Sequence, residues 1–155
     1  MQEKRELLRH ALAALAYRAT RAVEDAPEEF GEFGKAGKKP VEIVAHMGDL
    51  FDWALGIAEG KGRWHESTPQ GWKADVARFF AALGKFDAYL ASDAPLETSA
   101  EKLMQAPVAD ALAHVGQIAM LRRLAGVPAR GESFYSAAIA IGQVGMEQPA
   151  PVRPF

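Results

Sequence analysis

Apolar residues recur at spacings of three and four between residues 72 and 90, and this is the most regular pattern in the chain. An α-helix has about 3.6 residues per turn, so side chains spaced in this way share one face. The pattern therefore predicts a helix over residues 69–90 whose apolar face belongs to the core. That face is formed by Trp72, Val76, Phe79, Phe80, Leu83, Phe86 and Leu90.

Three other segments have helical periodicity, and none has the period-two alternation of a half-buried strand. The first covers residues 3–23, with Leu8, Leu12, Leu15 and Ala19 on its apolar stripe. The second opens at Pro40, and the last opens at Pro107 and ends at Gly126. Proline is favoured at the first position of a helix, and glycine just after the last.

The connections between these segments are of unequal length. Residues 25–39 are rich in glycine and charge, and we expect Phe30 and Phe33 to anchor this long connection to the core. Thr68 before Pro69 is typical of an N-cap followed by a first turn. The residues after Gly131 predict only a short helix or turn and an extended terminus. Together these features predict an all-α single domain over residues 1–155, built as a four-helix bundle.

Composition and charge exclude several classes of protein. The chain has no cysteine, which excludes disulfides, thiolate metal ligands and a cysteine nucleophile. Its net charge is −2 and its basic residues are interspersed with acids, so we expect no nucleic-acid partner. No apolar run is long enough to predict a membrane span, and the charged start MQEKRELLRH does not resemble a secretion signal, so we expect a cytoplasmic protein without a membrane partner.

The last predicted helix carries three polar residues in an apolar context: Asp110, His114 and Gln117. On a helical wheel these three residues cluster on one side. Arg122 and Arg123 lie on the opposite side, which we take to face solvent because arginine is rarely buried without a partner. We therefore expect the three polar side chains to be buried, where they need hydrogen bonds or a metal ion to offset the loss of water.

The second predicted helix offers a partner for this cluster. His46 shares a stripe with apolar residues, so it too is expected to face inward; the stripe consists of Ile43, Met47, Leu50, Trp53 and Ile57. His46, Asp110 and His114 would form a set of two imidazoles and one carboxylate. Such a set binds divalent iron, manganese, nickel or zinc and leaves positions open.

Alternatives remain for each of these residues. Asp110 and His114 are one helical turn apart and could pair only with each other. Gln117 could orient a metal-binding histidine or bond to neighbouring helices. Glu42 and Asp49 flank His46 and could replace Asp110, although each is expected at a solvated edge. His65, beside Trp64, is expected at the surface, with the lining of a substrate entrance as the alternative.

Two stretches resemble proteins of the DinB/YfiT-like family. HVGQIAMLRRLAG, residues 114–126, resembles the motif of that family's last helix, and AHMGDLFDWALG, residues 45–56, resembles the stretch with its first metal-binding histidine. The resemblance implies a four-helix bundle with a crossover connection, and a metal site with one histidine from the second helix and two from the last. His46 matches the first ligand and His114 the last.

Asp110 falls where the family has its middle histidine. A carboxylate there would keep the number of ligands and favour iron or manganese over nickel or zinc, or it would mark the loss of metal binding. The resemblance implies a metal-dependent transferase that joins a small thiol to an electrophile.

Chemistry alone allows a metal-dependent hydrolase equally well. A further alternative is a non-catalytic stress-response or interaction protein whose buried network is structural. A homodimer formed through an outer face with His10 and Tyr17 is compatible with each of these functions.

Overall fold

A computed structural model describes residues 1–34 and 37–155 of the chain. Within these ranges the protein is all-α, as predicted, and it contains no strand beyond an isolated bridge between Glu132 and Pro154. No helix in the described part is both long and apolar enough to cross a membrane. The helices are α1 (Gln2–Val23), α2 (Pro40–Ala58), α3 (Trp72–Ala91), the short α4 (Ala100–Leu103) and α5 (Ala109–Leu124).

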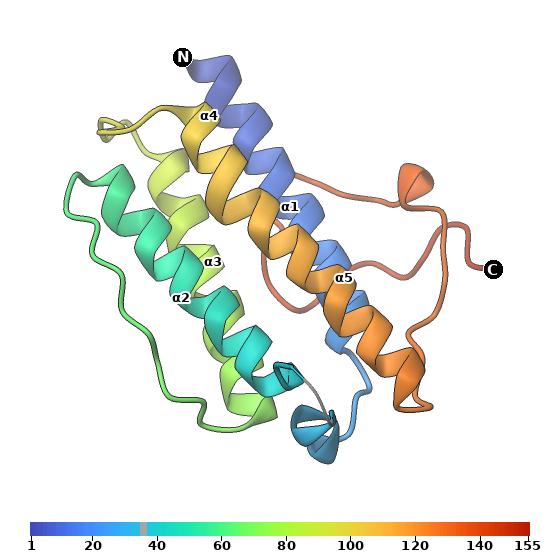
Figure 1. The fold of residues 1–155 in the computed structure, drawn as a ribbon. Helices are drawn as coiled ribbons and strands as arrows, with labels where there is room; N and C mark the ends of the chain where they lie inside the picture. Colours follow the sequence, from blue (N-terminus) through green and yellow to red (C-terminus); the bar gives the residue numbers. More distant parts are fainter. Residues whose placement is uncertain (35–36) are drawn as a thin grey trace.

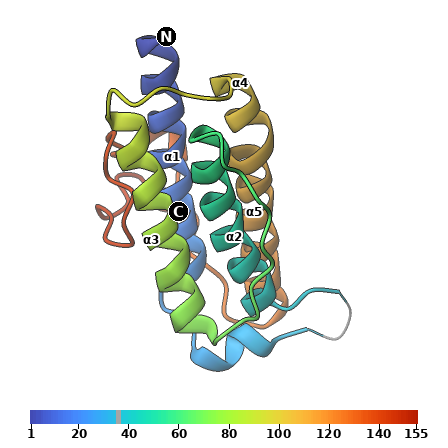
Figure 2. The same cartoon turned by 90° about the vertical axis from the view of Figure 1, so that its left-hand side faces the viewer.

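The four long helices lie lengthwise against one another (Figure 1). α1 runs down from the N-terminus in this view, α2 runs up, α3 also runs up, and α4 and α5 run down. Residues 59–71 join α2 to α3 by passing back along the full length of the helices, as the view turned by 90° also shows (Figure 2). This long connection lets α2 and α3 run parallel as neighbours, and α5 also lies beside α2 (Figures 1 and 2).

The core lies where the apolar faces of these helices meet. All seven apolar residues of the pattern over 72–90 are buried, as predicted. Phe30, in the 3₁₀ turn Glu28–Glu32, is buried against Trp72, with their rings in an edge contact at 5.1 Å. Phe33 packs against the same core. The prediction that these two phenylalanines anchor the first long connection is confirmed.

The start of α3 differs from the prediction. The helix begins at Trp72, and Thr68 does not cap it. The carboxylate of Asp75 instead accepts hydrogen bonds from the backbone N–H groups of Gln70 and Gly71, at 2.7 and 3.1 Å. Gly71 has a φ of 137°, a backbone conformation that residues other than glycine rarely adopt. The chain therefore turns into the helix at this glycine and not at Pro69.

Pro107 does not begin the last helix, contrary to the prediction. The helical run starts at Ala100, where Ser99 Oγ accepts a hydrogen bond from the N–H of Lys102. It continues into α5 through a π-helical turn, Met104–Val108, which contains the proline. A proline has no N–H to donate and crowds the preceding turn, so a local break in the α-helical hydrogen bonds accommodates it.

Arg122 is buried, whereas the helical wheel assumed that it faces solvent. Its guanidinium donates hydrogen bonds to the carbonyls of Ala22, Glu24 and Val127, which lie at the ends of α1 and α5. The buried face of α5 is therefore centred on Ala111, Val115, Ile118 and Arg122. Asp110, His114 and Gln117 lie roughly a quarter turn from that centre. They are not in the core, and they border it on the side facing α2.

The C-terminal residues fold back onto α1. Glu132 is buried and accepts hydrogen bonds from Tyr17 Oη at 2.6 Å and from Arg21 Nε at 2.8 Å. Burial and the bond to Glu132 raise the pKa of Tyr17, so the phenol stays protonated and donates. His10 is exposed as expected, but Tyr17 is fully buried. The outer face predicted for dimerisation is therefore partly covered by the chain's own C-terminal segment.

Candidate metal centre

His46 lies in the middle of α2, at the edge of the helix's buried face. The stripe that it shares with Ile43, Met47 and Leu50 is buried, whereas the imidazole itself keeps 26% of its side-chain surface exposed. The residue thus points between α2 and α5 rather than into the core. The prediction that His46 lies on the inner side of its helix is therefore correct, but the imidazole is less buried than expected.

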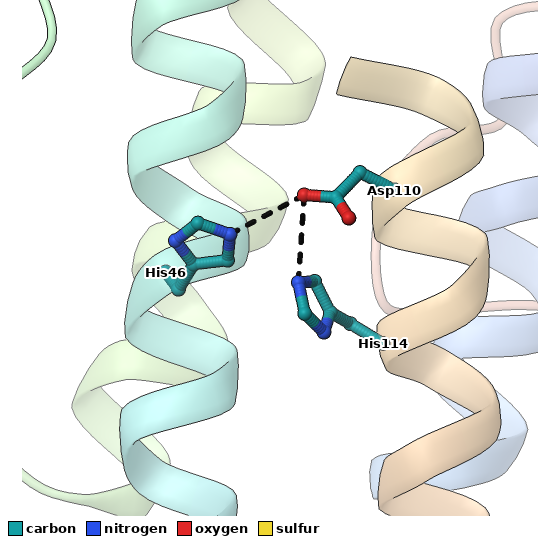
Figure 3. Close-up of side chains that lie close together, drawn as sticks. All are labelled: His46, Asp110 and His114. Carbon is teal, nitrogen blue, oxygen red and sulfur yellow. Dashed lines mark hydrogen bonds and ion pairs between the residues drawn. The ribbon is translucent and has the colours of Figure 1, made fainter. Parts of the chain in front are cut away.

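Asp110 and His114 face His46 from successive turns of α5. Asp110 Oδ2 lies 3.4 Å from His46 Nε2 and 3.5 Å from His114 Nε2 (Figure 3). His46 and Asp110 are 64 residues apart in the sequence, so the packing of α2 against α5 brings them together. The three predicted ligands therefore converge, and no other comparable group of acids and histidines occurs within residues 1–34 and 37–155.

The spacing of the three donor atoms fits a metal site. Metal bonds to nitrogen and oxygen in such sites are about 2.1 Å long, so two ligand atoms at a tetrahedral angle lie about 3.4 Å apart. Both distances from Asp110 to the histidines have this value, and all three donor atoms lie within 4.8 Å of one another. The two imidazole nitrogens would approach each other by at most about 1.4 Å on binding an ion.

Gln117 fixes the orientation of one imidazole. Its side-chain oxygen lies 2.8 Å from His114 Nδ1. An amide oxygen can only accept, so Nδ1 carries the proton and Nε2 keeps its lone pair directed toward Asp110. Histidines that bind metal commonly donate their second ring N–H in this way. Of the two interpretations of Gln117 from the sequence, the structure therefore supports the orienting one.

The segment between α2 and α3 supplies an aromatic wall beside the site. The ring of Trp64 lies 5.4 Å from that of His46 and 6.2 Å from that of Trp53, and Trp64 remains 47% exposed. His65 is exposed, as expected. From the sequence, the lining of a substrate entrance was only an alternative for Trp64 and His65. In the structure Trp64, and not His65, lies against the ring of His46. Only the path of this connection along α2 reveals that contact.

The two alternative carboxylates are engaged elsewhere. Glu42 is exposed as expected, and its carboxylate accepts a hydrogen bond from the N–H of Lys39 at 2.8 Å. Asp49 is buried, contrary to the prediction of a solvated edge. It accepts hydrogen bonds from the N–H and the hydroxyl of Ser67 and forms an ion pair with Arg78.

Burial raises the pKa of Asp49, but the bonds from Ser67 and the charge of Arg78 outweigh it, so the pKa is lowered. Asp49 therefore stays charged and holds the 59–71 connection to α2, about one turn from His46. It anchors the segment that carries Trp64, and it is not a metal ligand.

Comparison with family models, with curated proteins and with solved structures finds no match to this chain.

Proposed function

We propose that His46, Asp110 and His114 bind one divalent metal ion, which is iron, manganese, nickel or zinc. We further propose that the chain is a DinB/YfiT-like enzyme with that family's crossover four-helix bundle, and that it joins a small thiol to an electrophile. The single observation that carries the metal site is the convergence of two imidazoles and a carboxylate, from two separate helices, at distances suited to metal coordination.

The residues around the site support a catalytic role beyond holding an ion. Three protein ligands leave coordination positions open. A metal ion there would supply a positive charge that lowers the pKa of a thiol beside it. Gln117 holds His114 in the tautomer that such an ion requires. Trp64, whose ring lies beside that of Trp53, offers an exposed aromatic surface against which the apolar part of an electrophile can pack.

The arrangement of the four long helices supports the family assignment. α2 and α3 run parallel, and a connection as long as the helices joins them, as a crossover bundle requires (Figures 1 and 2). His46 lies on the second long helix and the other two ligands lie on the last. The absence of cysteine is compatible with a thiol that arrives as a cosubstrate.

One observation favours a non-catalytic role instead. The side chain of Asp110 is 48% exposed, so its charge remains solvated and does not require a metal ion. The contact between His46 and Asp110 at 3.4 Å would then be a weak hydrogen bond that helps to hold α2 beside α5.

Metal analysis of protein purified without a histidine tag separates these two roles. We expect one equivalent of divalent metal after equilibration and an increase in melting temperature with added metal. Both effects should be lost in His46→Ala and in His114→Ala. His65→Ala removes an exposed histidine from the neighbouring segment and should behave as wild type.

Absence of stoichiometric metal, together with no stabilisation by any of the four ions, would contradict the metal site. Activity needs its own assay, in which the metal-loaded protein is offered several thiols with a panel of electrophiles. We expect the thiol to be consumed in proportion to the product, with its sulfur bonded to the electrophile. In a displacement the proton leaves with the displaced group, and in a ring opening or an addition to a double bond the product takes it up. A metal-loaded protein that hydrolyses the panel without thiol would instead identify a hydrolase.

A further inference from the structure

A hollow lies between α1, α5 and the start of the C-terminal segment. Its volume is about 580 Å³. From α5 it is lined by residues that include Leu112, Gly116 and Ala119, which lie roughly half a turn around the helix from the three metal-binding candidates. The hollow is therefore separate from the proposed metal centre.

Four arginines line this hollow: Arg18, Arg21, Arg123 and Arg130. Arg21 is buried and its charge is compensated by Glu132. The other three are exposed, and none of them forms an ion pair with an acid in the described part of the chain. Three uncompensated positive charges thus meet in one concave region of a protein whose net charge is negative.

Arg18 is held in a defined position at the wall. Its guanidinium carbon lies 4.0 Å from the centre of the Phe134 ring, in a cation–π contact. The edges of a guanidinium stacked in this way remain free to donate hydrogen bonds. Planar, delocalised guanidinium groups match the oxygens of carboxylates and phosphates. The arginines of the hollow are therefore suited to an anionic group.

Apolar residues of α5 also line the hollow. Leu112 and Val115 contribute branched apolar side chains, and the small residues Gly116 and Ala119 leave space above the surface of α5. A Cβ added at Gly116 would meet no atom within 4 Å, so the space above this glycine is open. A lining of arginines and apolar side chains favours a ligand with an anionic head group and an apolar body over an inorganic ion.

The C-terminal segment gives the hollow a fixed wall. Arg130 and Phe134 flank Glu132, which Tyr17 and Arg21 bind from α1. Backbone hydrogen bonds between Ser133 and Arg153, and between Phe155 and Gly131, brace the same stretch. A wall positioned before binding lowers the entropy cost of binding a ligand.

We propose that this hollow, lined by Arg18, Arg123, Arg130 and Phe134, binds a small amphipathic anion, either a carboxylate or a phosphate monoester with an apolar body. Its volume lies within the range of about 300 to 1,000 Å³ that is usual for small-ligand sites. The site makes the C-terminal segment part of a binding surface, and it does not depend on the proposed metal centre.

Titration with decanoate and with decyl phosphate tests the proposal, using calorimetry for affinity and amide NMR for location. We expect saturable binding of at least one of them, with shifts at the amides of Gly116 and Gly131. Gly48, on α2, should not shift. Decanol and decyltrimethylammonium have the same chain without the negative charge and should bind at least tenfold more weakly. Whichever anion binds more tightly identifies the head group.

Arginine variants link the binding to the proposed residues. Arg123→Gln and Arg130→Gln should each weaken binding about three- to tenfold, since each removes one partly screened charge contact. Arg153→Gln removes an exposed arginine outside the hollow and should leave the affinity unchanged, as should His46→Ala. The proposal fails if neither anion saturates, if decanol binds as well as the anions do, or if Arg123→Gln and Arg130→Gln bind like wild type.

Discussion

Two carboxylates in this protein join distant parts of the chain in opposite ways. Glu132 attaches the C-terminal segment to α1, and its side chain is 1% exposed. Tyr17 and Arg21 contact both of its oxygens at 2.6 to 2.8 Å. Asp110 bridges α5 and α2, but it is half exposed and directs one oxygen toward two imidazoles at 3.4 and 3.5 Å (Figure 3).

The comparison indicates that Glu132 has a structural role, whereas Asp110 is still able to bind a ligand. A buried carboxylate needs hydrogen bonds to offset the loss of water, and both oxygens of Glu132 have a close partner. Asp110 remains solvated, and its distances to the imidazoles are too long for strong hydrogen bonds but suit ligands of one ion. Removal of Glu132 should therefore affect folding, and removal of Asp110 should affect metal binding.

The largest effect on stability is expected from Glu132→Ala. The substitution leaves the buried guanidinium of Arg21 without its main partner, and breaking a buried pair in this way costs about 3 to 5 kcal/mol. Urea denaturation should show this loss in the free energy of unfolding. A loss below about 1 kcal/mol would mean that the C-terminal segment contributes little to folding.

Asp49→Asn tests a third carboxylate, which is buried and hydrogen-bonded like Glu132 but lies beside the proposed metal centre. We expect a loss of about 1 to 3 kcal/mol at pH 7, because the bonds from Ser67 and Arg78 are weakened.

The pKa of Asp49 is lowered in the folded protein, so its contribution is complete above its unfolded pKa of about 4 and is lost as the pH falls further. Denaturation curves of wild type and Asp49→Asn should therefore converge below about pH 4. A gap between the two proteins that widens on acidification would contradict the lowered pKa.

Gln117→Leu tests the orientation of His114 without removing a ligand. Loss of the partner of a metal-binding histidine typically weakens metal affinity about 10- to 100-fold. Competition with a chelator of known affinity would measure the change. The unfolding free energy of the metal-free protein should stay within about 0.5 kcal/mol of wild type, because Gln117 is exposed.

Only a small change in stability is expected from Asp110→Ala in the absence of metal. An exposed carboxylate with two long contacts contributes at most about 1 kcal/mol. The same variant should lose the stabilisation by added metal that we expect for wild type. Asp110→His should retain metal binding and shift the preference toward nickel or zinc, since it exchanges an oxygen ligand for a nitrogen. A loss in metal-free Asp110→Ala as large as that in Glu132→Ala would remove the distinction between the two carboxylates.

The sequence predicted the helices best where apolar periodicity was long. The stripe from Trp72 to Leu90 has the same spacing over the whole helix, and its burial matches the pattern. The ends of helices depend on single residues and were predicted less well. Pro107 is a typical first residue of a helix, but a π-helical turn accommodates it inside a longer run.

The sequence predicted that His46, Asp110 and His114 lie together, and the structure brings them together, although the argument for their burial was wrong. The wheel assumed that Arg122 faces solvent, but three carbonyls at helix ends accept its hydrogen bonds and make its burial tolerable. The polar stripe consequently lies beside the core rather than in it. Local periodicity could not predict the bond between Arg21 and Glu132, which are 111 residues apart, or the position of Trp64 against His46.

A crystal structure of the protein equilibrated with manganese or zinc tests the central claim most directly. We predict a single anomalous peak about 2.0 to 2.2 Å from His46 Nε2, Asp110 Oδ2 and His114 Nε2, with the hydrogen bond from His114 to Gln117 retained. An unoccupied site at saturating metal, or an ion bound without Asp110, would contradict the two-histidine, one-carboxylate centre.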